Sequence, residues 1–325
     1  MAVYVNTNYS ALQGQRYLGN VQNQLTTTYQ RLSSGMRINS AKDDAAGLQI
    51  ADRLTSQING LNQGNRNASD GIALAQTAEA GMDEISGMLQ KMRTLAVQAN
   101  NGTNTKEDKQ ALSKEASALA TEITRIAQQT TFAGKTILNG KQTNSIDPLP
   151  GGAQPAPPPG QQGGAGANQT ITLQVGSNKG DTISFNLVNL QFSKAAIDGK
   201  VDANLFGDAN TNDKLFKKSA DGKSMTVVFT AAGGPEAMID AMDKMIGYVD
   251  SQRADLGAIQ NRLESSIRNQ SNVAANEADA RSRIRDADFA EESANLSQQS
   301  IIQQAAASML MQANTRPQLG LSLLG

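Results

Sequence analysis

The chain turns a corner at residues 31–54, RLSSGMRINSAKDDAAGLQIADRL, where one helical pattern stops and another starts. Ser33, Ser34 and Gly35 predict the end of the first helix, because glycine readily takes the left-handed conformation that closes a helix. The next four residues, MRIN, are expected to be extended, with Ile38 pointing inward. The stretch therefore predicts a structural joint between two helices.

The second helix is expected to begin at Ser40. Ser40 and Asp43 have the Ser-x-x-Asp spacing of a helix start, and Asp43 and Asp44 would lie in the first turn, where the helix dipole favours negative charge. The small residues at 45–47 leave room for another segment of backbone. The two aspartates could instead form a metal or acid–base site, but no neighbouring residue supplies a third ligand, so the structural interpretation is preferred.

Helical stripes flank this joint at both ends of the chain. In residues 8–35 and 286–314, apolar side chains recur at helical intervals, and in the first stretch they alternate by three and four as in a coiled coil. We expect both stripes to be assembly seams, made of Leu18, Val21, Leu25, Thr28 and Leu32 in the first and of Phe289, Leu296, Ile302, Ala305, Met309 and Ala313 in the second.

Longer helical tracts lie between the terminal stripes. Residues 54–75 and 112–126 carry the pattern on either side of a polar turn at 99–108, and residues 236–284 carry it again. An ordinary helical bundle would explain these stripes. Their length and mirrored placement favour a mainly α fold, an elongated antiparallel helical rod or coiled coil built from both termini.

The middle of the chain has a different character. Residues 147–168 hold six of the eight prolines and predict an exposed, partly extended loop. Alternating apolar residues predict a β-hairpin at 170–188 with a GSNKG turn, and a further strand at 223–231. The expected fold is therefore completed by the β-hairpin and by a small central α+β or β elaboration.

Composition excludes several classes of function. The 325 residues carry a formal charge of −1 and include neither His nor Cys. Balanced charge argues against nucleic acid as a partner, and the usual general base, thiolate ligand and thiol nucleophile are missing. We expect no enzyme activity, no metal and no cofactor. The first twenty residues lack the pattern of a Sec signal peptide, and no apolar run is long enough for a membrane helix, so no membrane partner is expected.

Three polar stretches carry weaker hypotheses. Residues 208–213, DANTND, begin like a calcium loop, but Asp213 and Ser219 stand where such a loop needs Gly and Glu, so a surface loop is preferred. The Asn-rich residues 64–82 indicate polar packing or a hydrogen-bonding interface in an assembly. The mixed charges at 280–292 indicate a solvated helix face, or a means of setting register between rods.

Five stretches closely resemble bacterial flagellin, the subunit of the flagellar filament. They are the joint at 31–54 and residues 65–98, 131–140, 256–267 and 280–314. The resemblance covers about 1–140 and 236–325, includes the hairpin, and is weakest at 143–169 and 191–235.

The resemblance implies three parts. Residues 1–42 and 284–325 would form an inner terminal coiled-coil domain, and residues 43–190 and 236–283 a surrounding rod domain with the hairpin and the Pro/Gly-rich loop 143–169. Residues 191–235 would be a small variable outer elaboration. The terminal helices would be largely disordered in the monomer and fold on assembly. The residues that would connect the two domains are Ser33, Ser34, Gly35, Ile38, Ser40, Asp43 and Asp44.

The resemblance also implies partners and a location. The chain would be exported through the flagellar type III apparatus and polymerise outside the cell into a helical filament for motility. An export chaperone would bind residues 286–325, and cap and junction proteins would bind the filament. A host Toll-like receptor would contact Gln90, Lys91, Leu95, Gln98 and Glu122. Lys91 stands where the family has arginine. Lysine keeps the positive charge but lacks the planar guanidinium fork.

Three alternatives remain from the sequence. A hook–filament junction protein has similar terminal helices, but both ends match the filament subunit better. An enzyme-bearing flagellin would use a His-rich zinc site, which a chain without His cannot build. A generic coiled-coil scaffold would not need so specific a joint.

Overall fold

The computed structural model describes residues 7–140, 169–208, 214–218, 225–230 and 234–322. The predicted loop at 147–168 and most of the calcium-like segment 208–213 lie outside the described residues. The chain divides into two compact units. We call residues 1–59 with 272–325 the terminal unit, and residues 60–271 the central unit.

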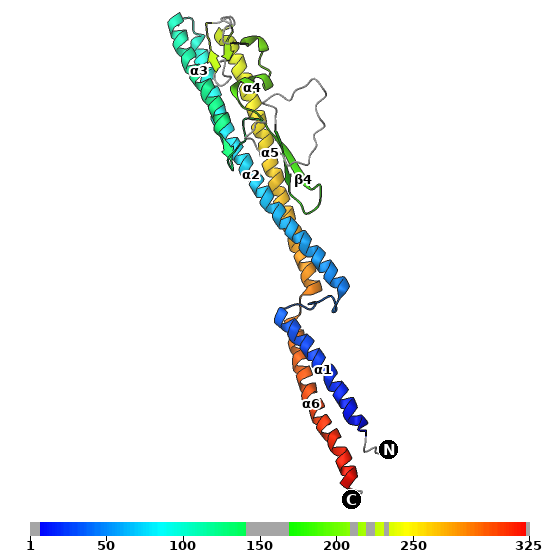
Figure 1. The fold of residues 1–325 in the computed structure, drawn as a ribbon. Helices are drawn as coiled ribbons and strands as arrows, with labels where there is room; N and C mark the ends of the chain where they lie inside the picture. Colours follow the sequence, from blue (N-terminus) through cyan, green and yellow to red (C-terminus); the bar gives the residue numbers. More distant parts are fainter. Residues whose placement is uncertain (1–6, 141–168, 209–213, 219–224, 231–233, 323–325) are drawn as a thin grey trace, which may run out of the picture. The chain divides into compact units, whose positions relative to one another are not determined.

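Two antiparallel helices form most of the terminal unit: α1 (Tyr9–Ser34) and α6 (Phe289–Ser322), blue and red in Figure 1. Asn8, just before α1, donates a 2.7 Å side-chain hydrogen bond to the carbonyl of Ala313, late in α6. At the other end of the pair, Nη1 of Arg31 lies 3.1 Å from Oε1 of Glu292, which makes an ion pair between the two helices. The helices predicted at 8–35 and 286–314 are confirmed, and they pack against each other.

Two longer helices, α2 (Ala45–Ala99) and α5 (Gly234–Arg285), run antiparallel through the central unit and continue into the terminal unit. Arg93 pairs with Asp243, and Gln260 donates a 2.9 Å hydrogen bond to Glu79. The helical tracts predicted at 54–75 and 236–284 are confirmed. Side chains at alternating steps of three and four on α2 are buried in the core, among them Ala75, Ala78, Met82, Ile85, Leu89, Met92, Ala96 and Ala99.

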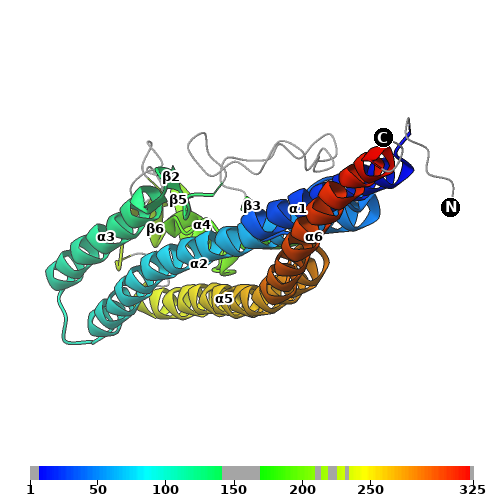
Figure 2. The ribbon, with the colours of Figure 1, turned by 90° about the horizontal axis from the view of Figure 1, so that it is seen from below.

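Helix α3 (Lys106–Gln129) lies beside α2, as Figures 1 and 2 show. It begins with a capping box in which Thr105 accepts the backbone N–H of Asp108 and the Asp108 carboxylate accepts the backbone N–H of Thr105. The polar turn predicted at 99–108 is confirmed. Ala116 and Ile123 from the predicted stripe are fully buried against the core.

The predicted hairpin is confirmed by strands β3 (Gln169–Gln174) and β4 (Thr182–Leu187). They pair antiparallel with Ile171 opposite Phe185, and both side chains are buried. The hairpin reaches α2 at Gly64, where an added Cβ would lie 2.1 Å from the carbonyl oxygen of Val175. Only glycine allows the hairpin backbone to approach the helix so closely.

Short elements follow α3 and the hairpin. Strands β1 (Thr131–Phe132) and β2 (Lys135–Thr136) form a small ribbon, and helix α4 (Phe192–Asp198) packs its buried face on the core. A 3₁₀ turn, η1 (Ala203–Leu205), precedes a three-stranded sheet. The sequence did not predict these elements, because each offers too few residues to show a period.

The sheet contains β5 (Phe206–Asp208), β6 (Phe216–Lys218) and β7 (Met225–Val227), with β5 parallel and β7 antiparallel to β6. The strand predicted at 223–231 is β7, which is shorter than expected but keeps Met225, Val227 and Phe229 buried. The fold is mainly α with small β elements, as predicted. Within the described ranges, none of the helices combines the length and apolarity needed to cross a lipid bilayer.

Candidate functional site

Helix α1 ends as predicted, at a glycine in the left-handed conformation. Gly35 has a φ of 69°, and its N–H donates a 2.8 Å hydrogen bond to the carbonyl of Arg31. The Ser34 hydroxyl accepts the backbone N–H of Met36 at 3.2 Å. The first bond pairs a carbonyl that the helix end would leave without a partner, and the second holds the backbone where it turns into the joint.

A second segment, residues 284–287, completes the joint, and the sequence analysis missed it. Met36 and Asp286 form an antiparallel bridge, and the N–H of Arg37 donates a 2.7 Å hydrogen bond to the carbonyl of Arg285. The Arg37 side chain also donates to the carbonyl of Ile284 at 2.8 Å. The passage from α1 to α2 is thus tied to the passage from α5 to α6.

The start of α2 differs from the prediction, which placed it at Ser40. The Asp43 carboxylate accepts the backbone N–H groups of Asn39 and Ser40, at 3.2 and 2.9 Å, and the Ser40 hydroxyl donates to it at 3.0 Å. Ser40 therefore belongs to a separate turn. Asp44 caps α2 instead, since its Oδ1 accepts the N–H of Gly47 at 2.9 Å, and the helix begins at Ala45.

The bonds at Asp43 also change its acidity. Hydrogen bonds from the backbone N–H and then the hydroxyl of Ser40 hold the pKa of Asp43 below its ordinary value of 3.8. A lowered pKa means that this carboxylate contributes stability above the ordinary value and loses it as the pH falls through the lowered one. The stabilisation that Asp43 gives to the turn at 39–43 should therefore be complete above the ordinary pKa of 3.8 and weaken as the carboxylate is protonated in more acidic solution.

Ile38 anchors the joint, as predicted, and is only 3% exposed. The prediction that residues 45–47 leave room for another backbone is wrong at Gly47. A Cβ there would lie 2.8 Å from Cδ1 of Ile38 and 2.4 Å from Oδ2 of Asp44, so these two side chains take the space. Gly47 lets the anchor and the helix cap pack side by side.

Gly35→Ala is expected to destabilise the end of α1 by about 1 kcal/mol, because a Cβ disfavours positive φ even though no atom lies within 4 Å of it. Gly35→Asn should recover much of the loss, since asparagine tolerates this conformation. Amide hydrogen exchange over the last turns of α1 in the filament would measure both effects. Equal loss in the two variants would contradict the conformational explanation.

Contacts between α1 and α6 are largely polar. Besides the Arg31–Glu292 pair, Thr28 donates to Gln299 at 3.1 Å, and Gln303 donates to Gln22 at 2.9 Å. Among residues of the two helices whose burial is described, the buried ones are Val21, Thr28, Glu292 and Ala306. The pair therefore buries little apolar surface, and its register is set by matched polar groups.

The residues of the predicted assembly seams are buried or partly buried on α1, whereas some of those on α6 are exposed. On α1, Val21 and Thr28 are buried, and Leu18, Leu25 and Leu32 are partly buried. On α6, Leu296, Ile302 and Ala313 are partly buried, but Ala305 is exposed and Phe289 and Met309 are 62% and 67% exposed. The α6 positions that contact α1 include polar or small residues, as at Glu292, Gln299 and Ala306. For the three exposed residues, a role in an assembly seam stays a prediction.

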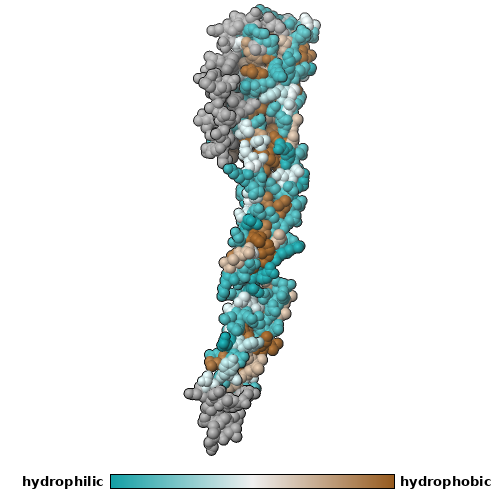
Figure 3. All heavy atoms as spheres, turned by 90° about the vertical axis from the view of Figure 1, so that its right-hand side faces the viewer, coloured by the Kyte–Doolittle hydropathy of each residue, from teal (hydrophilic) through white to brown (hydrophobic). Residues whose placement is uncertain are grey.

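Apolar side chains instead gather on the outer faces of these helices. Eight of the twelve large apolar side chains that are exposed among the described residues belong to α1 and α6: Tyr9, Leu12, Tyr17, Tyr29, Phe289, Ile301, Met309 and Met311. Figure 3 shows apolar patches (brown) among polar side chains on the face that it draws. Single exposed apolar residues are ordinary, but such a concentration on one helix pair indicates a contact surface.

The predicted receptor residues differ in their exposure to solvent. Gln90, Lys91 and Gln98 are exposed along α2, whereas Leu95 is only 7% exposed and offers little surface to a partner. Glu122 is partly buried on α3 and forms an ion pair with Arg125. The acidic side chain beside Lys91 is Glu115, 3.3 Å away, which the sequence analysis did not name.

Two other predicted stretches make contacts within the chain. Asn67 donates to the carbonyl of Gln174 at 2.9 Å, and Asn65 donates to Ser271 at 3.3 Å, so these residues of the Asn-rich face serve polar packing. In the charged stretch at 280–292, Arg283 pairs with Asp279 at 2.9 Å on an exposed face. Asp288 caps α6 by accepting the N–H of Ala290 at 2.9 Å.

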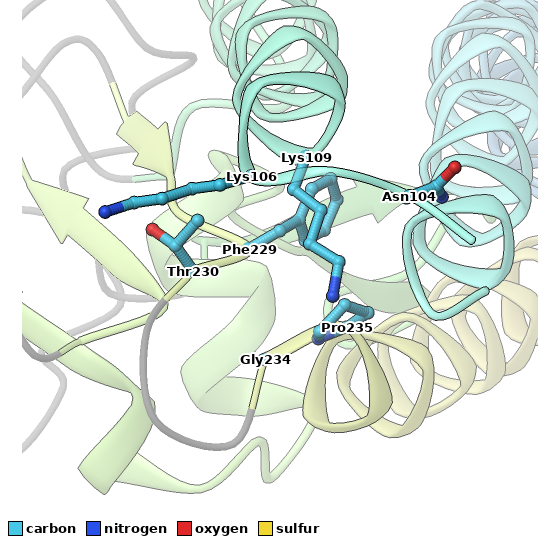
Figure 4. A pocket seen from close by; sticks show the side chains of 7 residues that line it. All are labelled: Asn104, Lys106, Lys109, Phe229, Thr230, Gly234 and Pro235. Atoms are coloured by element: carbon cyan, nitrogen blue, oxygen red, sulfur yellow. The ribbon is translucent and has the colours of Figure 1, made fainter. Parts of the chain in front are cut away.

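An open hollow of about 460 Å³ lies where the starts of α3 and α5 meet, and Figure 4 shows Lys109 reaching toward Pro235 while Lys106 extends away. Its lining offers two lysines but neither a carboxylate nor a nucleophile activated by a base. Among the described side chains, no group of three or more acidic residues is placed to hold a metal ion.

Comparisons with known proteins agree with this architecture. The family model of the bacterial flagellin N-terminal helical region matches residues 5–143, and that of the bacterial flagellin C-terminal helical region matches residues 239–324. The chain is 39% identical, over 378 aligned positions and 100% of both chains, to flagellin A of Vibrio anguillarum and equally to flagellin A of Vibrio cholerae serotype O1.

One solved structure gives a fold-level match. It is assigned to a flagellar hook-associated protein from Vibrio parahaemolyticus, has a TM-score of 0.52 and 14% identity, and the match covers 75% of this chain and 100% of that one. At this identity the likeness shows the fold alone, so the alternative of a junction protein gains no support from it. The chain belongs to the bacterial flagellin family, whose members are structural subunits of the flagellar filament and not enzymes.

Proposed function

We propose that this filament subunit polymerises through the outer faces of α1 and α6. The observation that carries the proposal is the inverted distribution of apolar groups in this pair. The contact between the helices holds Glu292, Gln299 and Thr28, while large apolar side chains such as Phe289 and Ile301 face outward. Copies of the chain that cover these outer faces would bury apolar surface, at about 25 cal/mol per Å².

The same distribution supports folding on assembly. Two helices that share few apolar contacts gain little from pairing, and isolated helices are marginal in water. Neighbouring copies would supply the stabilisation that the α1–α6 contact lacks. Subunits would therefore stay separate until they meet a growing filament end, where ordering the terminal helices is offset by burial.

The joint would connect two layers of the filament. We place residues 1–42 and 284–325 in an inner layer, and residues 43–190 and 236–283 in the rod domain around it, with 191–235 as the outer elaboration. Gly35, Ile38, Asp43 and Asp44 give the joint its geometry, and the bonds between 35–37 and 284–287 tie both passages together. Such a joint fixes the path of the chain from one layer to the other, and this role needs no reactive group.

Seeded elongation tests the proposal. Purified full-length chain is mixed with short filament seeds and followed by sedimentation and negative-stain microscopy, beside a truncation that lacks residues 1–40 and 286–325. Long filaments from the full chain and none from the truncation would support terminal-helix assembly. Elongation by the truncation would refute it, and a full chain that extends no seeds would point back to a junction protein.

Other partners follow from the same role. We infer that an export chaperone covers α6 within residues 286–325, because that helix exposes apolar side chains such as Ile301 and Met311 before assembly. Cap and junction proteins would bind the ends of the filament. Export through the flagellar type III apparatus, without a Sec signal peptide, would deliver the chain to the extracellular filament.

A host Toll-like receptor would bind the face formed by Gln90, Lys91 and Gln98 on α2 with Glu115 and Glu122 on α3. Lys91→Ala is expected to lower receptor signalling about tenfold, as for a central charged contact, and to leave seeded elongation unchanged. Lys109→Ala, on α3 beside the open hollow, is the matched control. A receptor-reporter cell assay measures both variants, and unchanged signalling by Lys91→Ala would remove this receptor face.

A further inference from the structure

The methionines of this chain fall into two environments. Ten of the eleven lie in the described residues. Met36 and Met88 are partly buried, and six others are at most 4% exposed: Met82, Met92, Met225, Met238, Met242 and Met245. Met309 and Met311, both on α6, are each 67% exposed. Solvent-borne reagents should therefore reach these two sulfurs far more readily than those in the core.

Met309 and Met311 stand on either side of the residue that faces α1. Leu310 lies between them and packs toward α1, since its Cδ1 would be 3.1 Å from a Cβ at Gly14. Successive residues of a helix are about 100° apart, so the two methionines flank this contact on opposite sides. Neither side chain supports the α1–α6 pair, and both belong to the outer apolar surface of α6.

We propose that Met309 and Met311 are a peroxide-sensitive modification site that controls whether a free subunit can enter the filament. This proposal rests on the assembly function proposed above. In the reaction with hydrogen peroxide, the thioether sulfur attacks one peroxide oxygen, the O–O bond breaks, and an S–O bond forms. The sulfur loses two electrons and the methionine becomes its sulfoxide, while the proton on the transferred oxygen passes to the departing hydroxide, which leaves as water.

Oxidation would act on assembly through polarity. A sulfoxide is a strong hydrogen-bond acceptor, and burying it at an apolar subunit contact without a donor is unfavourable. An oxidised subunit would then be rejected by the filament end, while its central unit stays folded because the core methionines are shielded. Once in the filament, the two sulfurs would be covered by neighbouring copies and protected.

The test uses full-length chain treated with limiting hydrogen peroxide, peptide-resolved mass spectrometry and seeded elongation. We expect Met309 and Met311 to be oxidised before the six core methionines and the elongation rate to fall at least about tenfold. Without peroxide, the double variant Met309→Leu/Met311→Leu should elongate at the normal rate. Peroxide treatment should change its elongation rate by less than about twofold. The control Met242→Leu/Met245→Leu, at two buried sulfurs, should respond as the unmodified sequence does.

A second measurement needs no variant. Partly oxidised chain is offered to seeds, and the sulfoxide content of 309 and 311 is compared between filament and unincorporated fraction. Enrichment in the unincorporated fraction would support the proposal. Equal sulfoxide content, or normal elongation after both residues are oxidised, would overturn it. Failure of untreated chain to extend seeds would refute instead the assembly function on which it rests.

Discussion

Replacing Gln304 with proline is expected to slow seeded elongation about 100-fold, because a proline inside a helix costs about 3 kcal/mol. Gln304 lies near the middle of α6 and its side chain is exposed. The substitution would therefore act on the backbone of the helix and leave the α1 contact residues unchanged. Gln304→Ala removes the same side chain, keeps the helix and should elongate at the original rate.

Both variants would be followed by sedimentation after seeding, with circular dichroism to show that the central unit still melts cooperatively. Because Gln304 belongs to the terminal unit, the melting of the central unit should be the same in both. A proline variant that elongates as fast as the alanine variant would mean that α6 need not be a continuous helix in the filament.

Gly64→Ala is expected to destabilise the central unit by about 2 to 3 kcal/mol, because overpacking against a rigid backbone forces the hairpin away from α2. The added Cβ would lie 2.1 Å from the Val175 carbonyl oxygen and 3.1 Å from Oε1 of Gln270. Neither the helix nor the backbone of the hairpin can move without losing other contacts.

Gly87→Ala is the matched control, since Gly87 lies on the same helix and nothing stands within 4 Å of a Cβ added there. It should stabilise the helix by about 1 kcal/mol, the ordinary advantage of alanine over glycine. Urea unfolding followed by circular dichroism compares the two variants. If Gly64→Ala were as stable as Gly87→Ala, the close approach of the hairpin would be refuted.

Helices and the hairpin could be predicted because their periods extend over many residues. In the tract at 236–284, the apolar spacing repeats from Met238 to Leu263, about seven turns, and the hairpin alternates cleanly through Ile171, Leu173 and Val175. Shorter elements could not be predicted from the sequence. The β1–β2 ribbon turns through Ala133 and Gly134, both with positive φ, where a two-residue turn usually shows Asn-Gly.

Two features of the candidate site could not be predicted from the sequence, because they depend on hydrogen bonds of polar groups. They are the α6 residues that contact α1 and the residue at which α2 begins. The apolar pattern of α6 predicts Phe289 and Met309 as seam residues. The side chains that are buried between α1 and α6 include Glu292 and Ala306 instead. At the joint, the spacing of Ser40 and Asp43 predicts a helix that begins at Ser40, with Asp43 and Asp44 together in its first turn. Their roles separate only when the Asp43 carboxylate is seen to bind the backbone of Ser40.

Amide hydrogen exchange of the full chain, as monomer and as filament, tests the central claim most directly. Exchange reports the free energy of local opening along each helix. We predict rapid exchange over α1 and α6 in the monomer, strong protection there in the filament, and protection of the central-unit parts of α2 and α5 in both states. Equal protection of α1 and α6 in monomer and filament would contradict the account, because the terminal helices would then be stable without their neighbours.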